Sequence, residues 1–153
     1  MKSSQLDSIE SSLTAVMRIA KRPGYWDELQ KRSGIIIDRP AAAIIIILSK
    51  CPSNFASVVT RLGIEAPSVS RKVHELEDKG LILRRPTDDK RVHELELSKE
   101  GLVIAESLLK AKRSIYQEVL NSWNDKDIDD LNRLLNKLEN EMKHIFENKR
   151  VTN

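Results

Sequence analysis

The sequence is poor in the residues that build disulfide frameworks and membrane spans. It contains one cysteine, Cys51, among 153 residues, which excludes an internal disulfide and indicates a reducing compartment. Its longest apolar run, residues 41–48, is far shorter than the ~20 residues that cross a bilayer. The N-terminal stretch is polar and lacks the apolar core of a secretory signal. These absences predict a soluble, cytoplasmic protein that has no membrane partner.

Motifs of catalytic and metal sites are also missing from the sequence. It has no Gly-rich phosphate loop, no nucleophile elbow and no His-Glu-x-x-His run. The three histidines, His74, His93 and His144, do not have the spacing of metal ligands. We therefore predict that the protein is not an enzyme and has no catalytic residue, metal site or cofactor. Cys51 is interpreted as a buried or half-buried structural thiol, because free cysteines are among the most buried residues.

Aromatic residues are scarce as well, at 4% of the chain, whereas hydrophobic residues make up 40% and charged residues 32%. This balance is typical of a helical globular protein with an aliphatic core. The net charge of +3 and the isoelectric point of about 9.0 permit nucleic-acid binding without requiring it. The position of the charges therefore matters more than their sum.

Hydrophobic periodicity predicts a mainly helical chain. Residues 41–50 are nearly all apolar and also fit a buried strand, but Asp38 is a good helix N-cap and Pro40 suits a first turn, which favours a buried central helix. The other predicted helices span about residues 4–21, 25–31, 55–62, 66–79 and 99–121, and a last helix follows Asn124 with an apolar stripe from Ile128 to Phe146. Pro23-Gly24 makes the first pair either two helices or one sharply bent helix. Ser53 or Asn54, Ser98 and Asn124 are the predicted N-caps of the helices that follow them, and Gly63 can take the left-handed conformation.

The central stretch, residues 53–97, has the order of a winged helix-turn-helix. Two short helices meet at Gly63, and two strand-like runs, residues 81–85 and 92–97, follow Gly80. The second helix carries small and basic residues in its N-terminal half, the half that enters the major groove in such folds. Its outward face carries Ser68, Arg71 and Lys72, with Ser70 at the flank. In the hairpin, the cations Arg84, Arg85, Lys90 and Arg91 are predicted to reach phosphates or the minor groove, with Asp89 supporting a neighbouring arginine.

The helices outside this stretch carry long apolar stripes. In the first helix the stripe includes Leu6, Ile9 and Leu13, and in the last it includes Leu131, Leu138 and many residues between and beyond them. Packing within the chain is one explanation for the first stripe, and cover by a second copy of the chain is the other. The stripes together exceed what one small core needs, which favours an intermolecular bundle.

The run from Ser68 to Gly101 resembles the signature of the MarR (multiple antibiotic resistance regulator) family of transcription factors. The matching elements, in order, are Ser68-Val69-Ser70-Arg71, Leu76-Glu77, Lys79-Gly80-Leu81-Ile82, Arg84-Arg85, Asp89-Lys90-Arg91 and Leu97-Ser98-Lys99-Glu100-Gly101. The resemblance extends in helix order over the whole chain. By position, it implies that Pro67, Ser68, Ser70, Arg71 and Lys72 are the DNA contacts of the second helix, and that Arg91 is the wing-tip arginine. The family's oxidant sensors carry a reactive cysteine near the N-terminus, a position that Cys51 does not match.

The resemblance implies one MarR-type domain over residues 4–148, with a DNA-binding winged helix at 53–97 and dimerisation helices at 4–34 and 99–148. It further implies a homodimer that binds double-stranded DNA at a pseudo-palindromic operator, usually represses, and releases DNA when a small phenolic or other aromatic effector binds. The alternative is a winged-helix module that contacts only proteins.

Overall fold

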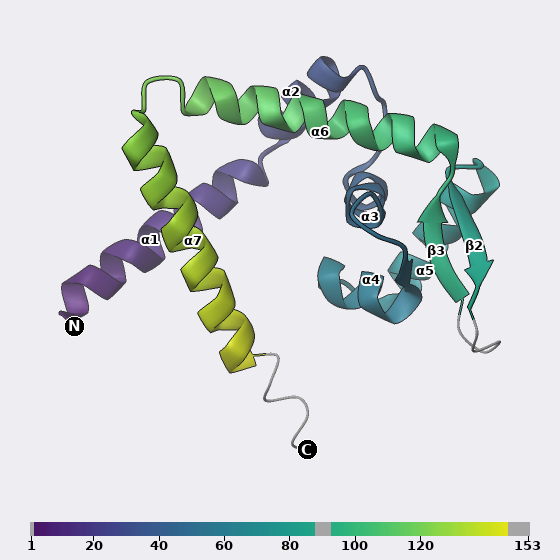
Figure 1. Cartoon of the computed structure of the whole chain (residues 1–153), viewed down its shortest axis with the longest axis horizontal. Helices are drawn as coiled ribbons and strands as arrows, with labels where there is room; N and C mark the ends of the chain where they lie inside the picture. The colour runs from purple at the N-terminus through teal and green to yellow at the C-terminus, as the bar shows by residue number, and fades with distance from the viewer. Residues whose placement is uncertain (1, 88–92, 147–153) are drawn as a thin grey trace. The chain divides into compact units, whose positions relative to one another are not determined.

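The computed structural model describes residues 2–87 and 93–146, and they form a mainly helical chain with a small antiparallel sheet (Figure 1). The predicted fold class, a winged helix with N- and C-terminal helices, is confirmed. The chain divides into two compact units, Met1–Ser114 and Ile115–Asn153.

Two helices begin the first unit. Helix α1 (Ser3–Ala20) has no buried residue, and α2 (Pro23–Ser33) buries Leu29. Pro23 lies in the first turn of α2, where its missing N–H costs nothing. Gly34 ends α2 in the left-handed conformation, and its N–H bonds the carbonyl of Gln30. The break at Pro23-Gly24 therefore separates two helices, which is the first of the two arrangements that the sequence allows.

Helix α3 (Arg39–Leu48) is the centre of the core. Its residues from Ala41 to Leu48 are all buried or half-buried. The Asp38 side chain accepts a hydrogen bond from the Ala41 N–H, as predicted for an N-cap. The preference for a helix over a strand at this stretch is confirmed. Cys51 follows α3 and is exposed, so its predicted burial is wrong. The helix ends at Leu48 with Ser49 as its C-cap, before the Cys51-Pro52 step.

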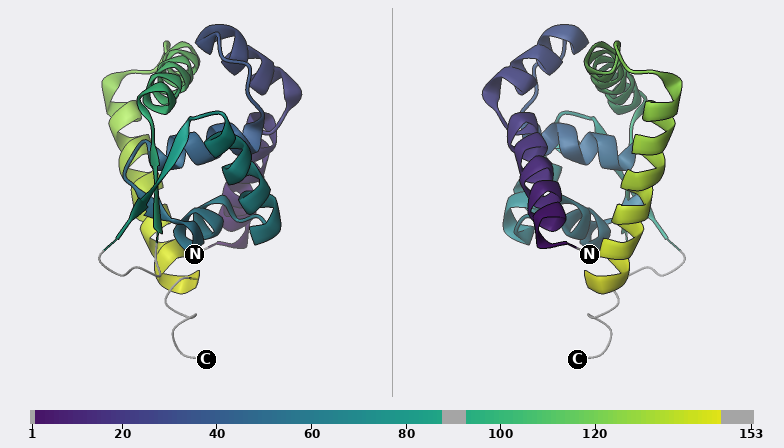
Figure 2. Two further views of the ribbon diagram at one scale, coloured as in Figure 1. Left: turned by 90° about the vertical axis from the view of Figure 1, so that its right-hand side faces the viewer. Right: turned by 90° about the vertical axis from the view of Figure 1, so that its left-hand side faces the viewer.

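Helices α4 (Phe55–Leu62) and α5 (Ala66–Asp78) pack against α3 (Figures 1 and 2). Gly63 ends α4 with a φ of 65°, and its N–H bonds the Val59 carbonyl. The left-handed turn predicted at Gly63 is therefore present. Two backbone hydrogen bonds close the C-terminus of α5. The Gly80 N–H donates to the Glu77 carbonyl and the Leu81 N–H donates to the Leu76 carbonyl. This pairing is a Schellman motif.

The sheet has three strands in the order β1-β3-β2. Strands β2 (Ile82–Pro86) and β3 (His93–Leu97) form the predicted hairpin, with Ile82 opposite Leu97. A two-residue strand, β1 (Ser53–Asn54), pairs with β3 through Leu95 and Glu94. The sequence did not predict β1, because two polar residues carry no alternation of hydrophobicity.

Two long helices complete the chain. Helix α6 (Lys99–Val119) begins after Ser98, whose hydroxyl accepts a hydrogen bond from the Gly101 N–H. Helix α7 (Asp125–Phe146) begins after Asn124, whose side chain accepts from the Asp127 N–H. Both predicted N-caps are therefore confirmed, and α7 has no buried residue.

Candidate nucleic-acid interface

Helix α5 has one face fixed in the core and one face open. Val69, Val73 and Leu76 are almost completely buried. This apolar row lies at the i, i+4, i+7 spacing that marks the inner face of a helix. The predicted contact residues lie elsewhere on the helix: Pro67, Ser68 and Arg71 are exposed and Ser70 is half-buried. The N-terminal half of α5 therefore presents one arginine and small polar residues to solvent.

Lys72, the fifth predicted contact residue of α5, is held by two carboxylates. Its ammonium donates to Asp38 Oδ2 at 2.5 Å and to Glu75 Oε2 at 2.5 Å. Its side chain is only 20% exposed. The hydrogen bond with Asp38, followed by the one with Glu75, raises the pKa of Lys72 above its usual value. Lys72 is thus charged and already paired.

The acidic C-terminal half of α5 forms a short charge network. Glu75 Oε1 accepts from Lys79 at 2.8 Å, in addition to the bond that Oε2 accepts from Lys72. These bonds, Lys72 first and Lys79 second, lower the pKa of Glu75 from 4.5 to about 2. Glu75 is therefore paired with Lys72 and Lys79, which reduces its repulsion of any phosphate nearby.

The predicted wing cations Arg84 and Arg85 lie on β2 and also face carboxylates. Arg84 donates from Nε to Glu77 Oε1 at 2.5 Å and from Nη2 to Glu77 Oε2 at 3.1 Å, a bidentate pair between β2 and α5. The bond to Glu77 raises the pKa of Arg84. Nη1 of Arg85 lies 3.4 Å from Oε2 of Glu96 on β3, and the Arg85 side chain is 62% exposed. Arg84 therefore braces the wing against α5, and Arg85 extends into solvent.

The remaining predicted wing residues, Asp89, Lys90 and Arg91, fall outside the described part of the chain. The base of the hairpin is fixed on its other side by α6. Ser98 N–H bonds the Leu81 carbonyl at 3.0 Å. A Cβ on Gly101 would lie 2.2 Å from that same carbonyl oxygen. Only glycine permits this approach. The start of α6 therefore packs directly against the turn that joins α5 to β2.

Three residues of this region have tertiary contacts that the sequence did not predict. Asp38 was predicted only as a helix cap, and its pair with Lys72 joins positions 34 apart, a separation that no local pattern reveals. Glu77 was noted only as part of the Leu76-Glu77 motif element, although it accepts hydrogen bonds from Arg84. Gly101 was noted only as part of a motif. Its role follows from a tertiary contact.

The described residues show neither a cluster of metal ligands nor a membrane-spanning helix. Within residues 2–87 and 93–146 there is no group of three or more His, Cys, Asp or Glu side chains placed to hold a metal ion. Among the helices described, none is long and apolar enough to cross a membrane.

Comparison with models of known families finds a match over the winged helix. A sequence model of the MarR family matches residues 45–93, from the middle of α3 to the first residue of β3. This match confirms the resemblance seen in the sequence. It spans both helices of the helix-turn-helix and most of the hairpin.

Solved structures with the same fold cover nearly the whole chain. A MarR family protein from Bacillus stearothermophilus aligns with a TM-score of 0.78 and 22% identity, over 94% of this chain and 99% of that one. Streptococcus pneumoniae FabT, solved in complex with DNA, aligns with a TM-score of 0.70 and 20% identity, over 92% and 99%. A MarR transcriptional regulator from Methanosarcina mazei aligns at 0.69 and 19%, over 90% and 98%. At these identities the likeness concerns the fold.

Proposed function

We propose that this chain, which carries the winged helix of the MarR family at residues 45–93, is a DNA-binding transcriptional regulator. The observation that carries the proposal is the open N-terminal half of α5, where Pro67, Ser68 and Arg71 face solvent while the opposite face is fixed in the core. A helix held in this way can enter a major groove without rearrangement. FabT, which has this fold, was solved with DNA bound.

We assign the wing to the DNA backbone or minor groove. Arg85 is the described wing cation with the more exposed side chain, and the sequence places Lys90 and Arg91 between the two strands. Contacts of this kind provide affinity that depends on salt concentration and little sequence preference. Arg84 contributes indirectly, because its guanidinium already pairs with Glu77.

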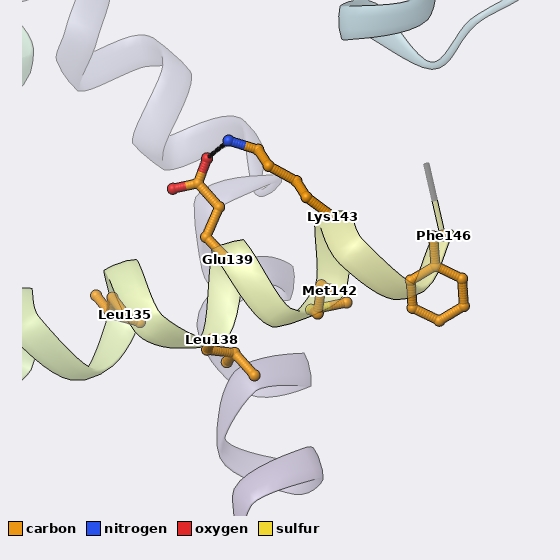
Figure 3. Close-up of a pocket in the computed structure, with 6 residues that line it drawn as sticks. All are labelled: Leu135, Leu138, Glu139, Met142, Lys143 and Phe146. Carbon is orange, nitrogen blue, oxygen red and sulfur yellow. Dashed lines mark ion pairs between the residues drawn. The ribbon is translucent and has the colours of Figure 1, made fainter. Parts of the chain in front are cut away.

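A homodimer is the form in which we propose that the chain acts. Helices α1 and α7 have no buried residue, although both carry large apolar side chains. Val16 on α1 is 65% exposed and Phe146 on α7 is 62% exposed. Figure 3 shows Leu138, Met142 and Phe146 projecting from α7 on the side away from the Glu139–Lys143 ion pair. Apolar faces of this length are typical of interfaces. The predicted dimerisation segments, residues 4–34 and 99–148, contain both helices.

Two finer parts of the proposal rest on the family resemblance alone: repression at a pseudo-palindromic operator, and release of the DNA by a small aromatic effector. In a two-fold dimer, the two α5 helices would enter successive major grooves about 34–36 Å apart. The serines of α5 discriminate poorly between bases, so no target sequence follows from them.

One observation favours the alternative function, a winged-helix module for protein contacts. The described wing cations Arg84 and Arg85 each pair with a glutamate, Glu77 and Glu96 respectively. Pairing of this kind lowers the positive potential available to phosphates.

Selection from a random library of 30-bp duplexes, followed by sequencing and mobility shift, distinguishes the two functions. A DNA-binding regulator enriches a motif with two-fold symmetry and binds it in preference to competitor DNA at moderate salt. A library without enrichment, together with no preference over competitor at any salt concentration, would exclude specific DNA binding.

A further inference from the structure

Asp38 and Arg39 are adjacent residues at the start of α3 that bind two different parts of the first unit. Asp38 uses Oδ1 to accept from the Ala41 N–H at 2.9 Å and Oδ2 to accept from the Lys72 ammonium on α5. The guanidinium of Arg39 donates to the Lys21 carbonyl at 2.6 Å and to the Arg22 carbonyl at 2.9 Å. One dipeptide therefore contacts both α5 and the junction between α1 and α2.

The contacts of Arg39 suit the chemistry of that junction. Lys21 is the C-cap of α1, and cations near a helix C-terminus interact favourably with its unpaired carbonyls. The Arg39 guanidinium also lies 5.7 Å from the ring centroid of Trp26 on α2, within the range of a cation–π interaction. Gln30 of α2 donates to the Ile37 carbonyl at 2.9 Å, which holds the α2–α3 connection from its other side.

Lys72 faces the dipeptide from α5, and its ammonium is already occupied by two carboxylates. Its ammonium has carboxylate partners at 2.5 Å on two sides. To bind a phosphate, the ammonium would have to leave Asp38 or share its protons among three acceptors. The carboxylate of Asp38 also places a negative charge beside the groove-facing helix, where plain electrostatics would weaken DNA binding.

We propose that Lys72 is a positioning residue, which with Asp38 and Arg39 ties the recognition helix α5 to the α1–α2 junction. The inference rests on the proposed function, in which α5 enters the DNA and α1 belongs to the dimer interface. The tie sets where α5 lies relative to α1 in each chain. In a two-fold dimer it thereby contributes to the spacing of the two recognition helices.

A double-mutant cycle on DNA binding tests the tie, with the duplex selected by the wild-type chain as probe. Asp38→Asn keeps a side chain that can cap α3 but removes the charge that holds Lys72. Lys72→Met removes the ammonium and keeps most of the stem. Each change is expected to weaken binding about threefold per chain, hence about tenfold for a dimer, the size of effect that exposed ion pairs produce. The double variant should bind no more weakly than either single variant.

The dependence on salt separates positioning from direct contact. If Lys72 positions α5, then the slope of log affinity against log salt is unchanged in Lys72→Met. If it binds a phosphate, the slope falls by about one unit per contact. The sign of the Asp38→Asn effect is a second criterion, because loss of a negative charge should tighten binding when no positioning is involved. A reduced slope in Lys72→Met, or tighter binding in Asp38→Asn, would overturn the proposal.

Asp130→Asn is the matched control. Asp130 lies on α7 between Lys126 and Arg133, at 2.7 and 3.0 Å, so the change also removes one carboxylate from between two cations. It alters the net charge by the same amount as Asp38→Asn. Its effect on DNA binding should be nil or a slight tightening. Lys72→Arg, which keeps a cation opposite Asp38, should restore most of the affinity that Lys72→Met loses.

Amide hydrogen exchange tests the tie without DNA and so separates its failure from failure of the proposed function. Arg39→Met breaks the contacts with the α1–α2 junction but leaves Asp38 and Lys72 in place. We expect exchange of the α5 amides around Lys72 to become about threefold faster in Arg39→Met and in Asp38→Asn. Changes confined to α1 and α2 in Arg39→Met would disprove the tie, whether or not a DNA motif is found.

Discussion

At the scale of single residues, Arg71 is the side chain of α5 for which the proposed DNA binding makes the clearest prediction. It is exposed, and it forms no ion pair with any other residue that the structure describes. Arg71→Ala should therefore weaken binding to the selected duplex, and it should reduce the salt slope by about one unit if the guanidinium binds a phosphate. Lys110→Ala, which removes an exposed cation from α6, should leave the slope unchanged. Mobility shifts over a range of salt concentrations measure both.

Gly101 supports a prediction about stability. Because a Cβ would meet the Leu81 carbonyl oxygen at 2.2 Å, Gly101→Ala forces the start of α6 away from the α5–β2 turn. The expected loss is about 1–3 kcal/mol in the free energy of unfolding, as for other overpacked sites. Urea denaturation measures it.

Gly24→Ala is the control for that substitution. Gly24 lies in the first turn of α2, and no atom lies within 4 Å of an added Cβ. Alanine there should be neutral or stabilise by up to about 1 kcal/mol, because it restricts the unfolded chain. Equal losses for the two alanine variants would mean that the contact with Leu81 is unimportant.

The sequence reveals roles of this kind only where they depend on neighbours along the chain. Asp38, Asn54, Ser98 and Asn124 were identified as possible caps because capping uses residues three apart, and all four cap their helices. The pairs Asp38–Lys72 and Arg84–Glu77 depend on how elements pack in space. A charged side chain on an amphipathic helix looks the same in a sequence whether it faces water or a partner.

At the scale of elements, the charge network of α5 predicts a dependence of stability on pH. The pKa of Glu75 is lowered from 4.5 to about 2 by Lys72 and Lys79, and Asp38 shares Lys72. Since the folded pKa is depressed, the contribution of Glu75 to stability is complete above about pH 4.5 and is lost as the pH falls toward 2. Lys72, whose pKa is raised, stays charged throughout this range.

Glu75→Gln should therefore be less stable than the wild type at pH 6, and the difference should narrow below about pH 4.5. Thermal unfolding followed by circular dichroism at a series of pH values measures the difference. Because Glu75 lies at the surface, the effect should be small. A difference that is constant between pH 6 and pH 3 would show that these bonds do not contribute in solution.

Elements with strong local signals are those that the sequence predicted well. Helix α4 has the predicted bounds, and α5 differs from its prediction at one end by one residue, because Gly63, Pro67 and Gly80 mark the turns. Strand β1 was missed because its pairing partner lies 40 residues further along the chain. The apolar stripes of α1 and α7 were also recognised, but a stripe does not say what covers it.

At the scale of the whole molecule, the exposed face of α7 predicts which substitution should dissociate the proposed dimer. Leu138 is 36% exposed and Met142 50%, on a helix without a buried residue. Leu138→Glu should raise the dimer dissociation constant at least about a hundredfold, because it would bury an unpaired charge. Sedimentation velocity at micromolar concentration measures this, and circular dichroism should show an unchanged helix content.

Asn140→Glu adds the same charge two residues away on α7, at an exposed polar position, and should leave the dimer intact. If the wild type sediments as a stable folded monomer, the proposed dimer is wrong. If both glutamate variants dissociate it equally, its interface does not use the Leu138 face in particular.

The close approach of Gly101 to Leu81 also bears on how such a protein can evolve. The hydrogen bond between Ser98 and Leu81 and the contact at Gly101 hold the two ends of the hairpin together at its base. Extra residues inserted between Pro86 and His93 would lengthen a loop whose ends are already joined, and each doubling of its length should cost only about 0.6 kcal/mol. The segment between Pro86 and His93 can therefore change in length while α5 and α6 keep their positions.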